Sequence, residues 1–305
     1  MGEEKILETD IAEPRKLESE EIAWARLFGL IAMHLGCLGL VWVSWSVFNI
    51  AAAIGLYLLR AFALTAFYHR YFAHRAFKTS RPVQFAGALI GLTALQKGPL
   101  WWAAHHRHHH RQSDQPDDVH SPIPRGFIWS HFGWILADRS SEVRENLIRD
   151  WLRFPELRWL ERLSMPIGVA FALLVYVTGE VLNAVAPTLQ TSGLSLLIWV
   201  FFVSTVALYH ATYSVNSFAH IFGRRRFATR DNSRNNLPVA LLTLGEGWHN
   251  NHHHYQSSAR QGFVWWEIDI SYYTLWMMSK IGLVWGLRGV PKHIMQRSLQ
   301  STAKA

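Results

Sequence analysis

The stretch LFGLIAMHLGCLGLVWVSWSVF, residues 27–48, determines the architecture that the sequence predicts. It runs for 22 residues without Lys, Arg, Asp or Glu. A helix of that length spans about 30 Å, the thickness of the hydrocarbon core of a bilayer. Comparable apolar runs occupy residues 50–67, 165–182 and 194–213. We therefore predict an all-α integral membrane protein with four transmembrane helices arranged as two hairpins.

The overall composition favours the same class of protein. Half of the 305 residues are hydrophobic and 17% are charged, whereas soluble domains carry about 25% charged residues. Cys37 is the single cysteine. This excludes a disulfide scaffold and any zinc or iron–sulfur site that is built from several thiolates.

The distribution of charge predicts the topology. The net charge is +8, yet residues 1–21 carry eight acidic and three basic side chains. We expect residues 1–24 to form an acidic, mobile tail and residues 25–300 to form one domain. Lys and Arg are absent from the expected turn at Asn49 and from the loop 183–193.

By contrast, 14 Lys and Arg lie within residues 68–162 and 11 follow residue 214. Positive charge stays on the cytoplasmic side of a membrane. Both termini and a helical cytosolic cap, made of residues 68–162 and 214–300, are therefore expected there. Because the basic residues flank apolar runs, they indicate a partner bilayer and no nucleic acid.

Histidine is the unusual residue type of this chain, with 17 copies. Twelve lie in four places, all on the predicted cytoplasmic side: His69 and His74; His105, His106, His108, His109 and His110; His220; His249, His252, His253 and His254. The triplet 106, 109, 110 and the triplet 249, 252, 253 each have the spacing that places three side chains on one helix face. Asn216 and His220 form a similar i, i+4 pair.

The chemistry of imidazole suggests the ligand. Imidazole binds iron, zinc, copper and nickel, and eight or nine such ligands exceed the roughly six positions of one ion. We therefore expect two metals, and iron because nothing resembles a hydrolytic site. Two alternatives stay open at this point. Residues 105–110 alone could be a solvated metal-scavenging loop, and His105, His108 and His109 offer the same spacing as His106, His109 and His110.

The order and content of these segments resemble a known family. The chain reads HRYFAH at 69–74, HRHHH at 106–110, NSFAH at 216–220 and GEGWHNNHH at 245–253, together with FKTSRP at 77–82, DDVHSP at 117–122 and SHFGW at 130–134. These motifs resemble the membrane fatty acid desaturases, in particular the Δ9 acyl-CoA (stearoyl-CoA) desaturase-like group, in a bacterial form. That resemblance implies four transmembrane helices below a cytosolic cap that holds a dinuclear iron site.

The resemblance also implies roles for individual residues. One iron would be held by His69, His74, His106, His110 and His252, and the other by His109, His220, His249 and His253, with Asn216 contacting the second iron through water. Gln96, Trp102 and Thr212 would line the bend of the substrate tunnel, and Arg139 matches a basic position that grips coenzyme A. Lys97, Ala104, His105 and Asp138 depart from the other headgroup positions. No separate acid or base is implied.

The implied activity is insertion of a cis double bond, at Δ9, into a saturated acyl chain carried by coenzyme A or by a lipid. Two ferrous ions would use O₂ and two electrons, because a methylene has no acidic proton for acid–base catalysis. A separate ferredoxin, rubredoxin or cytochrome with its reductase would deliver the electrons. The expected location is a bacterial inner membrane, with the active site cytoplasmic. A diiron hydroxylase of an alkyl or lipid substrate is the alternative function.

Overall fold

The computed structural model describes residues 21–301. Residues 1–20 of the predicted acidic tail lie outside the described residues. The helices are α1 (Trp24–Cys37), η1 (Leu38–Val41), α2 (Val47–Phe62), η2 (Ala63–Ala73), α3 (Arg81–Leu92), α4 (Pro99–Gln112), α5 (Pro122–Arg125), η3 (Trp129–Gly133), α6 (Trp134–Leu136), η4 (Asp138–Ser141), η5 (Glu145–Leu147), α7 (Arg149–Leu152), α8 (Pro155–Arg162), α9 (Ser164–Val185), η6 (Pro187–Leu189), α10 (Gly193–Leu196), η7 (Leu197–Val203), α11 (Ser204–Ile221), α12 (Leu237–Leu242), α13 (His249–His254), α14 (Ile270–Lys280) and α15 (Lys292–Ser301). The two short strands are β1 (Lys78–Thr79) and β2 (Val284–Trp285), which pair antiparallel.

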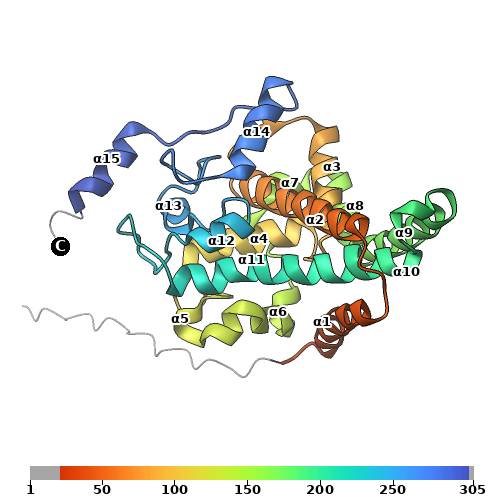
Figure 1. Ribbon diagram of the computed structural model, residues 1–305. Coiled ribbons are helices and arrows are strands. Elements are labelled where there is room, and N and C mark those ends of the chain that lie inside the picture. Colours follow the sequence, from red (N-terminus) through yellow and green to blue (C-terminus); the bar gives the residue numbers. More distant parts are fainter. Residues whose placement is uncertain (1–20, 302–305) are drawn as a thin grey trace, which may run out of the picture.

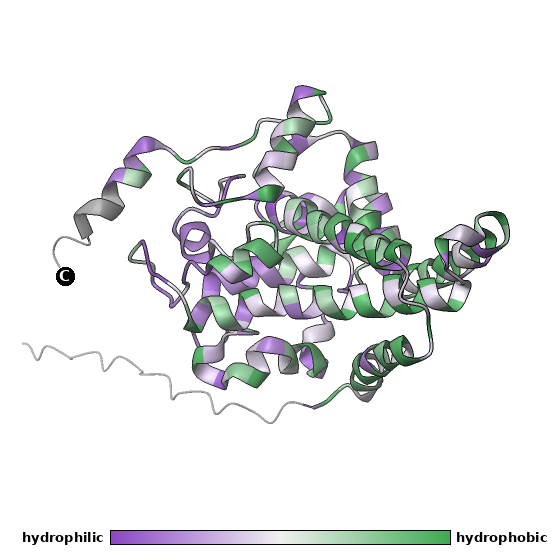
Figure 2. Ribbon diagram, in the orientation of Figure 1, coloured by the Kyte–Doolittle hydropathy of each residue, from purple (hydrophilic) through white to green (hydrophobic). Residues whose placement is uncertain are grey.

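The prediction of a helical protein with four membrane-spanning helices is confirmed. Trp24–Val41, Val47–Ala73, Ser164–Val185 and Gly193–Ile221 are long and apolar enough to cross a bilayer. Figure 1 shows α2 and α11 running side by side through the centre of the molecule, and Figure 2 shows hydrophobic residues along both helices. The helices outside the four spans form a cap around the ends of α2 and α11.

The first turn differs from the prediction. We expected the chain to reverse at Asn49, but Asn49 is the third residue of α2, and residues 42–46 connect the spans. Ser46 is the reason, because its hydroxyl accepts a hydrogen bond from the Asn49 backbone N–H and caps the helix. The buried Asn49 side chain then accepts a 2.6 Å hydrogen bond from Thr191 Oγ1. This bond joins the turns of the two hairpins.

The second and fourth spans are longer than hydropathy predicted. The second continues from residue 67 to Ala73 and the fourth from residue 213 to Ile221. Both contain π-helical turns, in η2 and η7, and such turns occur often at functional sites. The polar residues that end each apolar run are buried and paired inside the protein, so the helices continue through them.

The charge inside the second span is fully enclosed. Arg60 is 0% exposed. Its guanidinium donates hydrogen bonds of 2.6 Å to Thr205 Oγ1, 2.7 Å to Ser204 Oγ and 3.1 Å to the Thr93 carbonyl. Hydrogen bonding of this kind makes a cation tolerable at membrane depth. Arg60 therefore ties α2 to α11 and to the end of α3.

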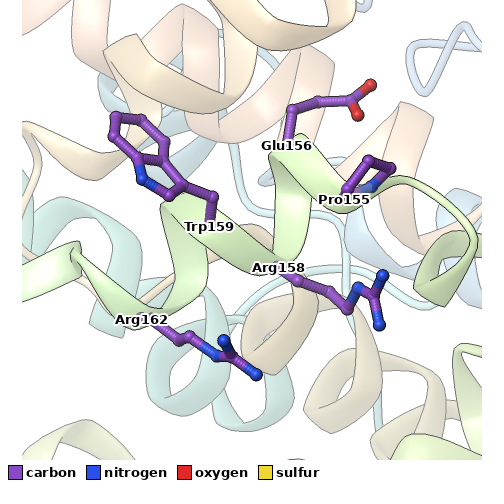
Figure 3. A pocket seen from close by; sticks show the side chains of 5 residues that line it. All are labelled: Pro155, Glu156, Arg158, Trp159 and Arg162. Carbon is purple, nitrogen blue, oxygen red and sulfur yellow. The ribbon is translucent and has the colours of Figure 1, made fainter.

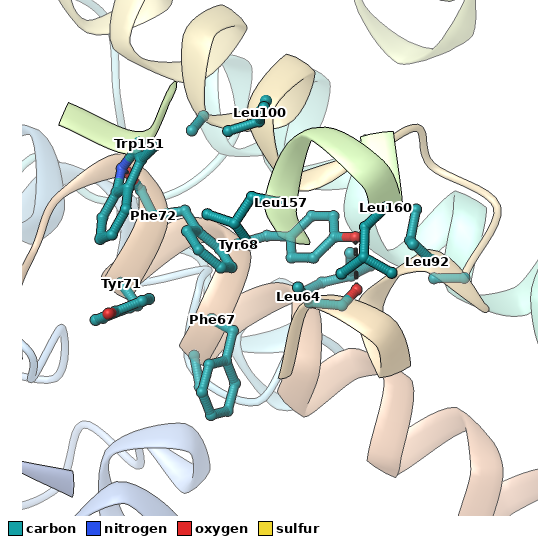
Figure 4. Close-up of a cluster of buried hydrophobic side chains, with 14 of the residues drawn as sticks. Leu64, Phe67, Tyr68, Tyr71, Phe72, Leu92, Leu100, Trp151, Leu157 and Leu160 are labelled. Carbon is teal, nitrogen blue, oxygen red and sulfur yellow. Dashed lines mark hydrogen bonds between the residues drawn. The ribbon is translucent and has the colours of Figure 1, made fainter. Parts of the chain in front are cut away.

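A hydrophobic core packs η2 against α3, α4, α7 and α8 (Figure 4). Tyr68 and Phe72 are 0% exposed, and Tyr68 donates a 3.0 Å hydrogen bond to the Ala88 carbonyl. Trp151 Nε1 donates to the Phe72 carbonyl at 2.7 Å. Because this face of η2 is fixed, the opposite face presents its histidine in a defined position.

Helix α8 links the cap to the spans. Its inner side buries Leu157 and Leu160, and its Glu161 carboxylate accepts hydrogen bonds from the first backbone N–H groups of α4, at 2.8 Å from Leu100 and 3.2 Å from Trp101. An anionic side chain at a helix N-terminus is favourable. The outer side bears an open pocket lined by Pro155, Glu156, Arg158, Trp159 and Arg162 (Figure 3), and α9 begins two residues later.

Candidate metal centre

Nine histidine side chains converge in two groups. The first contains His69, His74, His106, His110 and His252, and the second contains His109, His220, His249 and His253. Within each group the potential ligand nitrogens lie within 4.8 Å of one another. These are the two sets that the resemblance implied for two irons.

The first group is assembled from three parts of the chain. His69 lies on η2 and His74 follows it, while His106 and His110 are one turn apart on α4. The Nε2 atoms of His106 and His74 are 2.8 Å apart, and those of His106 and His110 are 2.9 Å apart. His252 on α13 completes the ring, with its Nε2 3.0 Å from that of His69.

The second group shares two of these helices and adds α11. His220 ends α11, and its Nε2 lies 3.0 Å from that of His249 on α13. His109 Nε2 lies 3.4 Å from His253 Nε2. Consecutive side chains on a helix point about 100° apart, so neighbouring residues on α4 and on α13 reach different groups.

The structure chooses between the two possible registers on α4. His105 belongs to neither group; its ring stacks on Trp101 with 4.1 Å between ring centroids. His108 Nε2 instead lies 3.0 Å from the Asp117 carbonyl oxygen. The triplet His106, His109 and His110 therefore faces the centre, and a solvated poly-histidine loop is not what the segment forms.

Four buried carboxylates fix the orientation of the imidazoles. Asp118 lies 3.0 Å from His109 Nδ1, Asp114 lies 3.1 Å from His220 Nδ1, Asp231 lies 2.6 Å from His253 Nδ1, and Glu246 contacts His69 Nδ1. An Nδ1–H that donates to a carboxylate leaves the Nε2 lone pair free for a metal and increases its basicity. Asp118 and Asp231 make this hydrogen bond to His109 and His253. Asp114 and Glu246 lie within ion-pair distance of His220 and His69.

Asp118 and Glu246 lie within the motifs quoted from the sequence, but the sequence predicted no pairing of any of the four acids with an imidazole. Asp114 and Glu246 were missed because their partners, His220 and His69, are distant in the chain. The partner of Asp231, His253, is nearer in the chain but was also missed. The available signal was weak: Asp114, Asp118 and Glu246 lie in or beside histidine-rich segments, and a buried carboxylate needs a partner.

The protonation states of five of the nine histidines suit metal binding. Burial lowers the pKa of His106, His110, His249 and His252 well below the ordinary value, so these rings are neutral at neutral pH. Burial also lowers the pKa of His253 to about 4, although Asp231 opposes the shift. Neutral imidazoles present lone pairs, as metal ligation requires.

A narrow cavity reaches both histidine groups. Its lining includes His69 and His106 from the first group and His109 and His249 from the second, with Trp102, Thr212 and Asn216 beside them. Its remaining wall is mostly apolar: Ala61, Leu64, Leu208, Ala211 and Val215, with Thr65, Thr243 and Glu246. The Asn216 side chain thus lies beside the centre, and its water-mediated contact stays a prediction.

The three residues predicted at the substrate bend lie together. Gln96 Nε2 donates a 2.9 Å hydrogen bond to Thr212 Oγ1, and Trp102 stacks on His106 with 5.0 Å between ring centroids. Gln96 stands between Leu95 and Lys97, which both adopt left-handed backbone conformations, with φ of 57° and 67°. Such strain persists where surrounding structure over-determines it. Contact of these residues with substrate stays a prediction.

Arg139 lies apart from this group. It is exposed on η4, with its guanidinium 6.0 Å from the centre of the Trp129 ring, and is not among the described residues that line the cavity. Its predicted role toward a substrate headgroup stays a prediction.

Three further histidines form a separate row. His34 Nε2 lies 3.0 Å from His210 Nε2, His210 Nδ1 lies 3.0 Å from His131 Nε2, and His131 Nδ1 lies 2.9 Å from Ser217 Oγ. The row joins α1, α11 and η3 and is outside both histidine groups.

Comparison with known proteins identifies relatives over nearly the whole chain. The sequence model of the family described as "Fatty acid desaturase" matches residues 41–275. The chain is 32% identical to an sn-2 palmitoyl-lipid 9-desaturase of Nostoc sp. (strain 36), over 88% of this chain and 92% of the relative. It is 33% identical to an sn-1 stearoyl-lipid 9-desaturase of Anabaena variabilis, over 86% and 93%. An acyl-CoA 5-desaturase of Anemone leveillei is 34% identical, over 98% and 92%.

Proposed function

The chain belongs to the fatty acid desaturase family, and from that premise we propose that it inserts a cis double bond into a saturated acyl chain at a two-iron centre, using O₂ and two electrons. Membership itself makes the protein an oxidoreductase that desaturates fatty acids. The observation that supports the two-iron proposal is the pair of histidine groups on one cavity.

The donor set fits two iron ions. Nine imidazole nitrogens in sets of five and four leave open coordination positions on ions that prefer about six ligands. Four nearby carboxylates, those of Asp114, Asp118, Asp231 and Glu246, supply negative charge that opposes the charge of two divalent cations. When bound, the irons supply the redox chemistry with O₂ that no amino-acid side chain provides.

The protein's own residues bind and orient the acyl chain of the substrate. The apolar wall of the cavity suits a methylene chain and excludes water. Trp102 lines the cavity and stacks on His106, so it holds this imidazole in place beside the cavity. The hydrogen bond between Gln96 and Thr212 adds a rigid polar point where the tunnel is expected to bend.

We place the double bond at Δ9. The Nostoc and Anabaena relatives are 9-desaturases. A closed tunnel sets the reacting carbons by their distance from the anchored end of the chain, so one anchor at the headgroup would give Δ9 products from both 16- and 18-carbon chains. Those two relatives act on lipid-linked chains and the Anemone relative acts on acyl-CoA, so both carriers are candidates for this chain.

The cap and both termini are proposed to face the cytoplasm of a bacterial inner membrane, where the basic surface receives the electron carrier. Arg224, Arg225 and Arg230 are exposed on the loop after α11. Arg230 directly precedes Asp231, which contacts His253. An acidic ferredoxin, rubredoxin or cytochrome would be attracted to this loop and would dock close to the second histidine group.

The test combines metal analysis with lipid analysis. Protein purified after growth in iron-rich medium should contain about two irons per chain. Cells that express it should accumulate cis-monounsaturated acyl chains, identified by gas chromatography of methyl esters. His110→Ala should insert into membranes but lose the product. Hydroxylated acyl chains in place of unsaturated ones, or activity that requires zinc, would contradict the proposal. Zinc alone would not, since Zn²⁺ binds such ligands more tightly than Fe²⁺.

A further inference from the structure

Helix α12 has an unusual surface for a helix of the cap. It packs on α11, yet it turns Leu237, Leu241 and Leu242 outward, with 49%, 46% and 57% of their surfaces exposed. α12 lies beside α11 in Figure 1, and Figure 2 shows it as a strongly apolar helix. Exposed leucines on consecutive turns indicate contact with an apolar surrounding.

The position of α12 along the second span indicates that this apolar surrounding is the bilayer. Tyr57 OH donates a 2.7 Å hydrogen bond to the carbonyl oxygen of Leu242, the last residue of α12. Tyr57 lies ten residues after Val47, where the second span begins, and this distance is about 15 Å along a helix. That position is close to the middle of a hydrocarbon core of about 30 Å. The end of α12 therefore lies beside the apolar part of the second span, at a depth that would be within the hydrocarbon core.

Both sides of this contact carry exposed apolar side chains. Ile54 and Leu58, which flank Tyr57 on α2, are 55% and 44% exposed. We name the line where α2 meets the end of α12 the α2–α12 seam. On its outer side the seam presents Ile54, Leu58, Leu241 and Leu242, which are all uncharged.

The inner side of the seam is the wall of the cavity. Ala61, Leu64 and Thr65 line the cavity from the second span, and Thr243 lines it from the residue after α12. Glu246, which contacts the ligand His69, follows three residues later. The seam thus has the bilayer on one side and the cavity of the histidine groups on the other.

We propose that the α2–α12 seam is the lateral opening through which the acyl chain of a membrane phospholipid passes from the bilayer into the cavity. This inference rests on the proposed desaturase function and names its substrate as a lipid-linked chain. A methylene chain can cross an uncharged, apolar seam without leaving an apolar surrounding. The two sides of the seam are joined by the hydrogen bond from Tyr57 to the Leu242 carbonyl. This bond can break without exposing a charged group.

The experiment locks the seam reversibly. Cys37 is the single cysteine, so Cys37→Ser gives a cysteine-free background. Tyr57→Cys and Leu242→Cys are then joined by a cleavable bis-thiol reagent in the full chain, loaded with iron and held in nanodiscs of dipalmitoyl phosphatidylglycerol. We expect linking to lower the rate of palmitoyl desaturation at least tenfold, and cleavage of the linker to restore it.

The matched control joins two other parts of the membrane region. Ser44 Oγ donates a 2.8 Å hydrogen bond to the Gln190 carbonyl, the same kind of contact between the turns of the two hairpins. Linking Ser44→Cys to Gln190→Cys should change the rate less than twofold.

Three results would overturn the lateral opening: equal rates before and after linking at the seam, an equal loss in the control, or desaturation of palmitoyl-CoA alone. If the unlinked protein desaturates neither substrate although it holds two irons, the proposed function itself fails and the opening fails with it.

Discussion

Asp118 offers the sharpest test of how the carboxylates prepare the metal ligands. Its side chain is fully buried, and both of its oxygens lie 3.0 Å from His109 Nδ1. Burial alone would raise the pKa of this carboxyl, but the charge of His109 and its hydrogen bond lower it well below the ordinary value. The carboxylate therefore remains an anion that holds the Nδ1–H tautomer of His109.

Asp118→Asn removes the charge while keeping the shape. The two carboxylate oxygens also accept hydrogen bonds from the backbone N–H groups of Asp114, at 2.9 Å, and His120, at 3.2 Å. Whichever way the new amide turns, its NH₂ group faces one of these donors. That loss costs about 1–3 kcal/mol of folding free energy.

The effect on metal binding is separate and additional. With its NH₂ toward His109, the amide favours the tautomer in which Nε2 carries the proton and cannot bind metal. Loss of such a carboxylate weakens metal affinity roughly 10- to 100-fold, which is about 1.4–2.7 kcal/mol. Because Asp118 is fully buried, we expect the upper part of that range and a selective loss of the second iron.

The assay is an iron titration against a competing chelator, with iron per chain measured at each step. Asp117→Asn is the matched control, since Asp117 is the preceding residue and is exposed. The control should retain about two irons where Asp118→Asn retains about one. Equal iron affinity and equal turnover in the two variants would refute the role assigned to Asp118.

Three other predictions address the tunnel, the cap and the topology. Thr212→Trp fills the cavity beside Gln96 and should change the rate or chain-length preference by gas chromatography while iron content stays at the wild-type level; an unchanged product profile would show that Thr212 does not line the tunnel. Burial raises the pKa of Glu161 although the N-terminus of α4 opposes the shift, so wild-type stability should fall as pH rises above the ordinary glutamate range. Glu161→Gln should lack that fall in thermal scans at pH 4.5–7.5, and parallel curves would contradict it. Cysteines introduced at positions 44 and 190 should react with impermeant reagents from outside, and one at position 115 only after permeabilisation; external labelling of residue 115 would place the cap on the wrong side.

The two histidine groups could be predicted because two independent patterns agree. Helical spacing placed three imidazoles of α4 on one face, and hydropathy with charge placed all four clusters on one side of the membrane. The structure assembles the groups with the same members. The partition of His109 and His110 into different groups came from the resemblance, since spacing alone places both on one face.

The carboxylates and the turn could not be predicted in the same way. Asp114 contacts His220, which is more than a hundred residues away in the sequence. No local sequence pattern indicates such a contact. The turn was misplaced because Asn49 was interpreted as a breaker, whereas the cap formed by Ser46 allows it to be helical. An ion-pair contact decides the structure in the first case and a side-chain hydrogen bond in the second, and hydropathy contains no information on either.

The continuation of α2 and α11 beyond their apolar segments follows from the same balance of polar contacts. A helix that leaves the hydrocarbon must satisfy its polar side chains, and on the second span these are His69 and Arg70, which are 4% and 1% exposed. Arg70 pairs with Glu246 at 3.0 Å and with Asp269 at 2.9 Å, and Glu246 also contacts His69. Removing one partner of a buried ion pair costs about 3–5 kcal/mol. His69 is therefore held by the network that lets the helix continue, so the two histidine groups lie at the ends of the two longest spans, α2 with η2 and α10 with η7 and α11.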